Sequence, residues 1–361
     1  MDTKINQNKE LKLWEALIPV VVLICMLAFN VFVYGDASLG GSNQFVLLLG
    51  GAVAAIVGYF NKVSFHKMLD EVANNIKSTA GAILILLMVG ALAGTWMVSG
   101  IIPSMIYYGL QILSPAIFLP ATLIICSVIS IATGSSWTTS ATVGIALIGI
   151  GGALGFDLGM VAGAVISGAY FGDKLSPMSD TTNLAPAMAG TDLFTHIKYM
   201  TLTTIPTYII TLILFIVLGL SVDVTGDANT DDLLNSITAS FNVTPWLFLV
   251  PVIVIGLIVK KTEPLVALLI GTLLAGIFAI IFQPEIVTQI TKADSLTFKS
   301  AYKGVMQAIT TEVIVPTENK TLADLFTSGG MAKMLPTIWL ILCAMVFGGI
   351  MDAIGALSKI S

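Results

Sequence analysis

The sequence predicts an all-α integral membrane protein with about ten transmembrane helices or half-helices. Of its 361 residues, 56% are hydrophobic and 10% are charged, and the mean hydropathy is +0.96. Soluble domains are about 45–50% apolar and about 25% charged, so a water-soluble fold could not bury this much apolar surface. The spacing of the apolar runs and the placement of the lysines are the other two observations behind this prediction.

Apolar runs suited to membrane helices recur along the chain. A bilayer core of about 30 Å needs about 20 apolar residues in a helix, and several of these runs are shorter. Short spans interrupted by glycine are typical of the broken helices that surround a transport site. The first run is too long for a cleavable signal peptide and no clear small-residue cleavage site follows it. The runs cover 17–34, 45–60, 80–99, 115–133, 140–153, 158–171, 199–220, 245–259, 264–282 and 335–357.

Lysine placement predicts the orientation of these spans, because cytoplasmic loops are enriched in Lys and Arg. The chain has no arginine, and lysine-bearing segments alternate with the lysine-free segments 35–44, 100–114 and 221–244. We therefore expect residues 1–16 to be a cytoplasmic N-terminus and 221–244 to be an external acidic loop. The segment 283–334 carries lysines on the predicted outside, where the rule is weak because the loop is long.

The chain contains a repeat whose copies we expect to have inverted topology. Four blocks recur in the same order, and the lysine pattern places the entry of the first copy inside and that of the second outside. The first repeat covers 17–220, and 245–361 is the start of the second. The polar motifs that follow Gly100 have no counterpart after Gly355, so we expect a longer protein of roughly 470 residues. The matched positions are Pro19 with Pro251; Val46, Leu48, Leu49, Gly51 and Ala55 with Val266, Leu268, Leu269, Gly271 and Ala275; Phe65, Val72 and Ile76 with Phe298, Val305 and Ile309; and Ile83, Leu87, Gly94 and Gly100 with Ile338, Leu342, Gly349 and Gly355.

A first polar motif interrupts the apolar runs at 133–140, which reads TGSSWTTS. Its hydroxyls and freed backbone carbonyls could replace the hydration shell of Na⁺, and the following helix N-terminus would suit a carboxylate. Ser/Thr packing between membrane helices is the alternative interpretation. The candidate ion ligands are Ser135, Ser136 and Thr138.

A second polar motif, GDKLSPMSDTTN at 172–183, directly follows an apolar run. Its carboxylates, hydroxyls and amide are the hard oxygen ligands that suit a small cation, and ionisable residues within a membrane indicate function. Burial of a carboxylate favours its protonated form, so one group could bind Na⁺ or H⁺ in competition. The alternative is a solvated cytoplasmic loop in which Asp173 pairs with Lys174 or caps a helix. The candidate ligands are Asp173, Ser179, Asp180, Thr181, Thr182 and Asn183.

The run GDKLSPMSDTTNLAPAMAGTD at 172–192, with TGSSWTTSATVGIA upstream, resembles the NhaC family of Na⁺/H⁺ antiporters in the ion-transporter superfamily. The resemblance covers essentially the whole chain. The departure from the family pattern is that the family's C-terminal part is missing. It implies two inverted repeats with re-entrant polar hairpins, and exchange of Na⁺ for H⁺ across the bacterial cytoplasmic membrane. Some relatives exchange malate for lactate, and the absence of arginine favours bare cations without excluding such acids.

Other features of the sequence narrow the function further. Asp352, in the last apolar run, is either an additional buried ion ligand or an interfacial residue. The three cysteines sit at unrelated spacings within apolar runs and indicate packing. No P-loop, HExxH or GxSxG motif occurs, which favours a secondary transporter over an enzyme. We expect Na⁺, H⁺ and the lipid bilayer as partners, no nucleic acid and no cofactor; a homodimer, an organic-acid exchanger and an inactive truncated remnant stay open.

Overall fold

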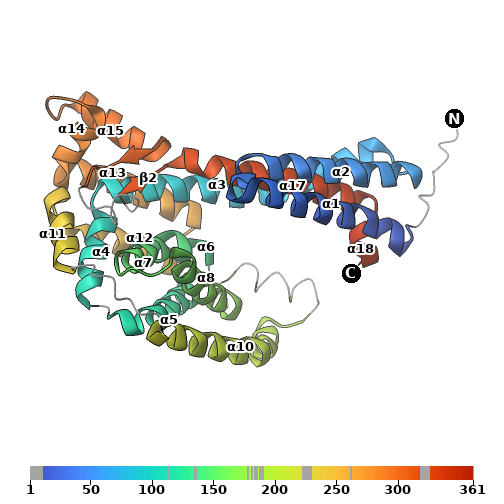
Figure 1. Cartoon of the computed structure of the whole chain (residues 1–361), viewed down its shortest axis with the longest axis horizontal. Helices are drawn as coiled ribbons and strands as arrows, with labels where there is room; N and C mark the ends of the chain where they lie inside the picture. Colours follow the sequence, from blue (N-terminus) through green and yellow to red (C-terminus); the bar gives the residue numbers. More distant parts are fainter. Residues whose placement is uncertain are drawn as a thin grey trace. The chain divides into compact units, whose positions relative to one another are not determined.

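The computed structural model of the chain describes residues 11–112, 114–133, 136–176, 179, 182, 186, 191–221, 230–260, 262–317 and 326–360 (Figure 1). The chain forms two compact units, of which unit 1 is Met1–Leu87 with Lys333–Ser361 and unit 2 is Met88–Ala332. The described regular structure is helical apart from a hairpin of β1 (Val313–Ile314) and β2 (Thr327–Ser328). The predicted all-α class is therefore confirmed.

All ten apolar runs fall on helices. Three runs, at 140–153, 245–259 and 335–357, are divided between two helical elements, and each of the others lies essentially within one helix. These helices are α1 (Leu13–Tyr34), α2 (Ser42–Phe60), α3 (Phe65–Val98), α5 (Pro115–Thr133), α7 (Ile145–Ala153), α8 (Leu158–Leu175), α10 (Leu193–Ser221), α12 (Leu249–Val259), α13 (Pro264–Phe282) and α17 (Leu335–Ala353).

Six helices in the described part of the chain are long and apolar enough to cross a membrane. They lie at Leu13–Tyr34, Ser42–Phe60, Phe65–Val98, Leu193–Ser221, Pro264–Phe282 and Met331–Ala353. A bent pair, Leu234–Ser240 and Pro245–Ile258, meets at 85° and raises the number to as many as seven. The apolar helices at 115–131 and 142–153 are shorter, which fits the prediction of half-helices alongside full spans.

Two stretches that we expected to be loops contain helices. The segment 100–114 forms α4 (Ile101–Ile112), which buries Ile102, Ile106 and Leu110. The segment 221–244 contains α11 (Thr230–Ser240). Helix α4 was not predicted because its 12 residues are too few to span a membrane. Helix α11 was not predicted because it is polar.

The remaining elements are short or amphipathic. They are η1 (Gly35–Gly40), α6 (Ser136–Thr139), a π-helical turn (Ser140–Gly144), η3 (Pro245–Phe248), α14 (Pro284–Thr291), α15 (Phe298–Thr310), η4 (Met331–Met334) and α18 (Ala356–Ile360).

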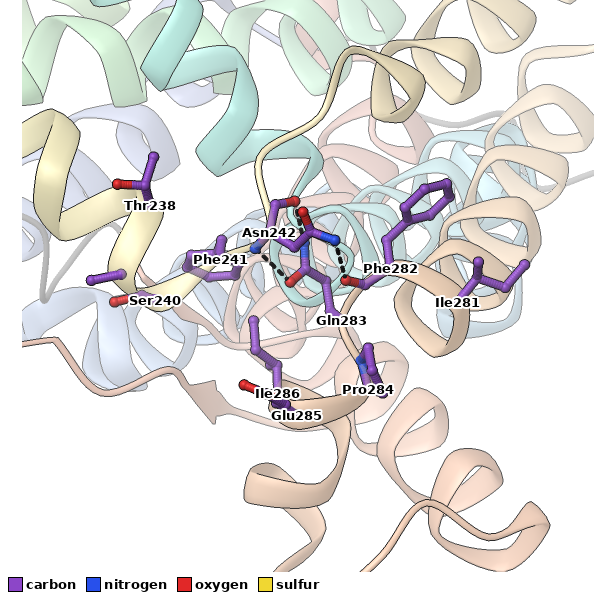
Figure 2. Close-up of a pocket in the computed structure, with 11 residues that line it drawn as sticks. Thr238, Ser240, Phe241, Asn242, Ile281, Phe282, Gln283, Pro284, Glu285 and Ile286 are labelled. Carbon is purple, nitrogen blue, oxygen red and sulfur yellow. Dashed lines mark hydrogen bonds between the residues drawn. The ribbon is translucent and has the colours of Figure 1, made fainter.

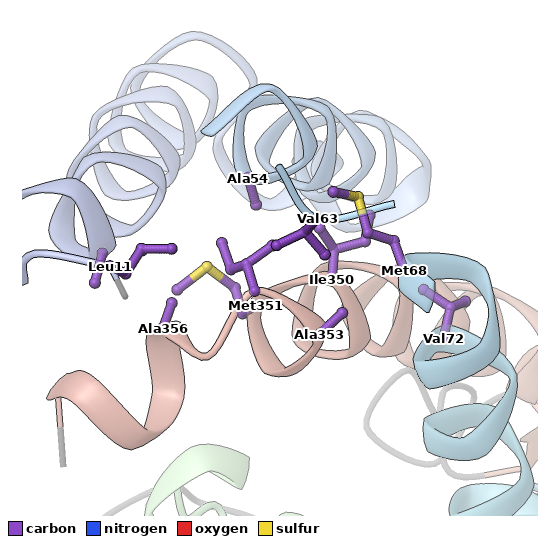
Figure 3. Close-up of a cluster of buried hydrophobic side chains, with 11 residues drawn as sticks. Leu11, Ala54, Val63, Met68, Val72, Ile350, Met351, Ala353 and Ala356 are labelled. Atoms are coloured by element: carbon purple, nitrogen blue, oxygen red, sulfur yellow. The ribbon is translucent and has the colours of Figure 1, made fainter. Parts of the chain in front are cut away.

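The core of unit 1 is a cluster of buried apolar side chains between α1, α2, the first part of α3, α17 and α18 (Figure 3). Glycines let these helices approach closely: a Cβ at Gly349 would lie 2.6 Å from the Cα atom of Val72. The cluster consists of Leu11, Ala16, Ala54, Val63, Met68, Val72, Ile350, Met351, Ala353, Ile354 and Ala356.

Positions paired by the sequence repeat share local geometry. Helices α2 and α13 each contain 19 residues. Gly100 follows α3 with a φ of 80°, and its partner Gly355 follows α17 with a φ of 75°. Since L-residues with a side chain rarely adopt this conformation, both positions need glycine, and both are followed by a further helix.

A second matched pair of glycines, Gly51 and Gly271, lies where helices of the two predicted copies contact each other. A Cβ at Gly51 would lie 3.7 Å from the Cα atom of Phe347 on α17, and a Cβ at Gly271 would lie 3.0 Å from Leu92 on α3. The same register pairs Leu92 with Phe347. In terms of the predicted copies, each of these contacts joins a helix of one copy to a helix of the other, and each compact unit contains segments of both copies. The inverted repeat stays a proposal that these features support.

Candidate functional site

Helices α5 and α8 of unit 2 touch through their backbones. A Cβ at Gly168 would lie 2.9 Å from the Cβ of Cys126, and a Cβ at Gly172 would lie 2.6 Å from the Ser127 carbonyl oxygen and from the Ile131 nitrogen. Because later residues of α8 meet later residues of α5, the two helices run in the same direction. Small residues permit such close approach between membrane helices. We call this contact the α5–α8 seam.

The seam ends where both helices end, and hydroxyl groups satisfy some of the last carbonyls. Ser176 Oγ donates to the Ile131 carbonyl oxygen at 2.8 Å, and Ser130 Oγ donates to the Ala169 carbonyl oxygen. Thr182 Oγ1 lies 3.0 Å from the Asp173 carbonyl oxygen and 3.3 Å from that of Lys174. The C-terminal ends of helices carry partial negative charge. Two such ends side by side favour a cation.

Asp173 occupies the last turn of α8 and is half-buried. Its Oδ2 atom accepts a hydrogen bond of 2.9 Å from Ser136 Oγ, which belongs to the other polar motif and is 6% exposed. No described residue donates to Oδ1, and no described lysine lies within ion-pair distance of Asp173, since the ion pair found among the described residues is His66 with Asp70. Among the residues that the structure describes, Ser136 is therefore the one side chain that donates to the Asp173 carboxylate.

A π-helical turn follows the serine that holds Asp173. Residues 136–139 form one α-helical turn, Ser140–Gly144 are π-helical, and α7 continues from there. Such turns inside helices occur frequently at functional sites. Gly144 permits the close approach of α8, because its Cβ would lie 2.7 Å from Val165 Cγ1. The π-helical turn therefore packs against α8 near Val165, on the same helix as Asp173.

The structure brings four of the sequence-predicted site residues together. Ser136 and Asp173 bond directly, and the Thr182 nitrogen donates to Ser179 Oγ at 3.3 Å while the Thr182 hydroxyl caps α8. Ser135, Asp180, Thr181 and Asn183 lie outside the described residues, as does the side chain of Thr138. The additional candidate Asp352 is exposed on α17 in unit 1.

Sequence reasoning missed a group that lies one helical turn from the site. Ser127 Oγ lies 2.9 Å from the Tyr208 hydroxyl oxygen and 2.7 Å from the Leu123 carbonyl oxygen. The Tyr208 ring, from α10, stacks on Phe171 with centroids 3.8 Å apart. The one available signal was a tyrosine in the middle of an apolar span, where its hydroxyl needs a partner.

A polar cavity of about 430 Å³ lies elsewhere in unit 2, between the end of α11 and the junction of α13 with α14 (Figure 2). Gln283 joins these segments, because its Oε1 accepts from the Asn242 nitrogen at 3.0 Å and its Nε2 donates to the Asn242 carbonyl oxygen at 2.9 Å. None of the described ion-site residues lines this cavity. Within the same described ranges, no group of three or more His, Cys, Asp or Glu is placed to hold a metal ion.

Comparisons with known proteins point to transport. Residues 168–361 match the model of the Na⁺/H⁺ antiporter family. The chain is 37% identical over 345 residues to the malate-2H⁺/Na⁺-lactate antiporter of Bacillus subtilis, covering 94% of this chain and 69% of that protein. It is 38% identical over 291 residues to the Na⁺/H⁺ antiporter NhaC of the same species, covering 80% and 61%. It is also 34% identical over 308 residues to NhaC of Alkalihalophilus pseudofirmus, covering 85% and 64%. No solved structure is significantly similar to the chain.

Proposed function

Because the chain belongs to the Na⁺/H⁺ antiporter family, we propose that it is a secondary transporter that exchanges Na⁺ for H⁺ across the bacterial cytoplasmic membrane. It is a multi-pass membrane protein of antiporter ancestry. The chain spans 61% and 64% of the two NhaC proteins that it matches, so its ions, its orientation and any homodimer belong to the proposal. The N-terminus is proposed to be cytoplasmic.

The bond between Ser136 and Asp173 carries the proposal. It joins the two polar motifs through residues that are 37 positions apart, at the level where α5 and α8 end. The surrounding groups are hydroxyls and carbonyls, which are the ligands that small alkali cations take in proteins. The proposed ion ligands are Asp173, Ser136, Ser179 and Thr182, together with Ser135, Thr138, Asp180, Thr181 and Asn183 from the same motifs.

The exchange follows from competition at one carboxylate. Na⁺ binds the ionised form of Asp173, while a proton removes the charge that holds Na⁺. Only one of the two ions can therefore occupy the site at a time. If the occupied site opens to each side of the membrane in turn, the proton gradient drives Na⁺ the other way. The residues perform no covalent step, and the protein acts as a transporter rather than as an enzyme.

A second candidate is an organic-acid exchanger. The relative that is 37% identical over 94% of this chain is named a malate-2H⁺/Na⁺-lactate antiporter, and such a protein also moves Na⁺ and H⁺. This chain contains no arginine, so within it only lysines and backbone N–H groups could bind a carboxylate. We favour bare cations for this reason.

The test is transport by the purified chain in proteoliposomes that contain a pH-sensitive dye. A Na⁺ pulse should move protons in the absence of any organic acid. Asp173→Asn should abolish this movement, because an amide cannot exchange a proton for Na⁺. The matched control is Asp157→Asn, at the N-terminal end of the same helix, where the exposed side chain accepts from the Met160 nitrogen at 3.0 Å. Proton movement that requires malate or lactate would contradict the proposal, as would normal transport by Asp173→Asn.

A further inference from the structure

The short helix α15 has an unusual outer surface. It contains 13 residues, which gives a length of about 20 Å and is too short to cross a bilayer. Phe298 is 91% exposed, Tyr302 is 63% exposed and Met306 is 37% exposed. These side chains are four residues apart, so they form one continuous apolar stripe along the helix.

The opposite side of α15 is packed against the rest of unit 2. Ser300, Ala301, Gly304 and Ala308 are buried. A Cβ at Gly304 would lie 2.8 Å from Val287 Cγ1 of α14. The orientation of α15 about its own axis is thus fixed by packing, and the apolar stripe must point away from unit 2.

Two lysines follow the apolar stripe along the helix. Lys299 and Lys303 are both exposed, and neither has an acidic partner within ion-pair distance among the described residues. Since a helix turns by about 100° per residue, these lysines lie beside the stripe rather than opposite it. A helix with an apolar face, a bordering cationic face and a buried third face is typical of an element at a membrane surface.

The position of α15 in the chain fits this environment. Helix α13, one of the six helices able to span a membrane, ends at Phe282, and the eight-residue α14 and a short turn lead directly to α15. The start of α15 is therefore separated from the end of a membrane-spanning helix by only one short helix and a turn.

The repeat contains a matching pattern at the start of α3. Phe65, which the sequence pairs with Phe298, is 66% exposed, and Leu69 one turn later is 49% exposed. Lys67 is exposed on the same stretch. Each stretch is also preceded by a lysine with positive φ, which is 64° at Lys62 and 53° at Lys292. The apolar stripe thus occurs twice at equivalent positions, with a lysine in each stretch, although Lys67 aligns with Ser300 and not with Lys299 or Lys303.

We propose that the exposed face of α15 is a binding surface for anionic phospholipids, with Phe298, Tyr302 and Met306 in the acyl-chain region and Lys299 and Lys303 on the headgroup phosphates. Exposed aromatic and apolar side chains next to lysines match the two layers of a lipid monolayer in chemistry and order. The surface also accounts for Lys299 and Lys303 in the long segment 283–334, because these two lysines would bind headgroups and would not report on topology.

A fluorophore attached at single cysteines tests the position of the apolar stripe. Tyr302→Cys and, as the matched control, Lys303→Cys are made without the three native cysteines, labelled, and reconstituted in phosphatidylcholine vesicles containing phosphatidylglycerol. The label at 302 should be quenched by acyl-chain spin labels and protected from aqueous iodide, while the label at 303 should be reached by iodide. Equal iodide access at both positions would overturn the proposal. Protection of position 302 from both quenchers would also overturn it, because a protein partner would then cover the stripe.

A second measurement tests the lysines. The unmodified protein should bind fluorescent phosphatidylglycerol in preference to competing phosphatidylcholine. This preference should fall about fivefold in Lys299→Gln and about fivefold in Lys303→Gln. Lys359→Gln, an exposed lysine on α18, is the control and should leave the preference unchanged. Unchanged preference in the Lys299→Gln/Lys303→Gln double variant would refute headgroup binding, whatever the transport activity of the protein.

Discussion

The α5–α8 seam predicts a specific effect of adding one methyl group at Gly172. In Gly172→Ala the new Cβ would lie 2.6 Å from the Ser127 carbonyl oxygen and the Ile131 nitrogen. Both are backbone atoms, which cannot rotate away as a side chain could. The helices must separate by roughly 1 Å to restore ordinary van der Waals distances. The variant therefore introduces strain into the α5–α8 contact directly beside Asp173.

The size of the effect follows from two opposing contributions. Alanine favours a helix over glycine by about 1 kcal/mol, whereas overpacking of this kind costs about 1–3 kcal/mol. Separation of the helices also weakens the bonds from Ser130 to Ala169 and from Ser176 to Ile131, at about 1 kcal/mol each. We expect a net loss of about 2–4 kcal/mol in the free energy of unfolding.

The control for this variant is Gly163→Ala on the same helix. Its Cβ would meet Phe215 Cζ at 3.8 Å, an ordinary contact, so the variant should be neutral or slightly stabilising. Thermal unfolding of both purified proteins should show a lower midpoint for Gly172→Ala alone, and Na⁺-driven proton movement should fall in the same variant. Equal midpoints and equal transport in the two variants would refute the close packing of α5 on α8.

Two further substitutions probe the site and its surroundings. Ser136→Ala removes the hydroxyl that bonds Asp173 and should raise the apparent Na⁺ constant about fivefold to tenfold without changing the shape of its pH dependence; an unchanged constant would show that Ser136 does not position the carboxylate. Tyr208→Phe removes the bond to Ser127 and should lower the unfolding free energy by about 1 kcal/mol, whereas Tyr199→Phe, at a tyrosine that is 68% exposed, should have no effect in the same melting assay.

The sequence predicted the membrane helices well because burial in lipid leaves a direct compositional signal. A run of apolar residues must become a helix when no water is present to satisfy its backbone, so all ten runs fell on helices. The signal failed for α4, whose residues Ile101–Ile112 are apolar but too few to span. It also failed for α11, because the residues Thr230–Ser240 are polar.

The sequence indicated the two polar motifs of the site but not how they meet. Asp173 and Ser136 could be selected because charged and hydroxyl groups are costly among apolar spans. Their direct bond depends on the parallel course of α5 and α8, which the glycines at 168 and 172 permit and which no local pattern encodes. Tyr208 was missed because its partner Ser127 is 81 residues away and both lie in apolar runs.

Competition between Na⁺ and H⁺ for Asp173 is the central claim, and the pH dependence of the apparent Na⁺ constant tests it most directly. The constant would be measured from Na⁺-driven proton movement in proteoliposomes at several values from about pH 6 to about pH 9. If both ions share one carboxylate, the constant should rise as pH falls, by about tenfold per pH unit for each competing proton once the site is mostly protonated. A constant that stays flat over this range would contradict the shared site and would mean that Na⁺ and H⁺ bind at separate places.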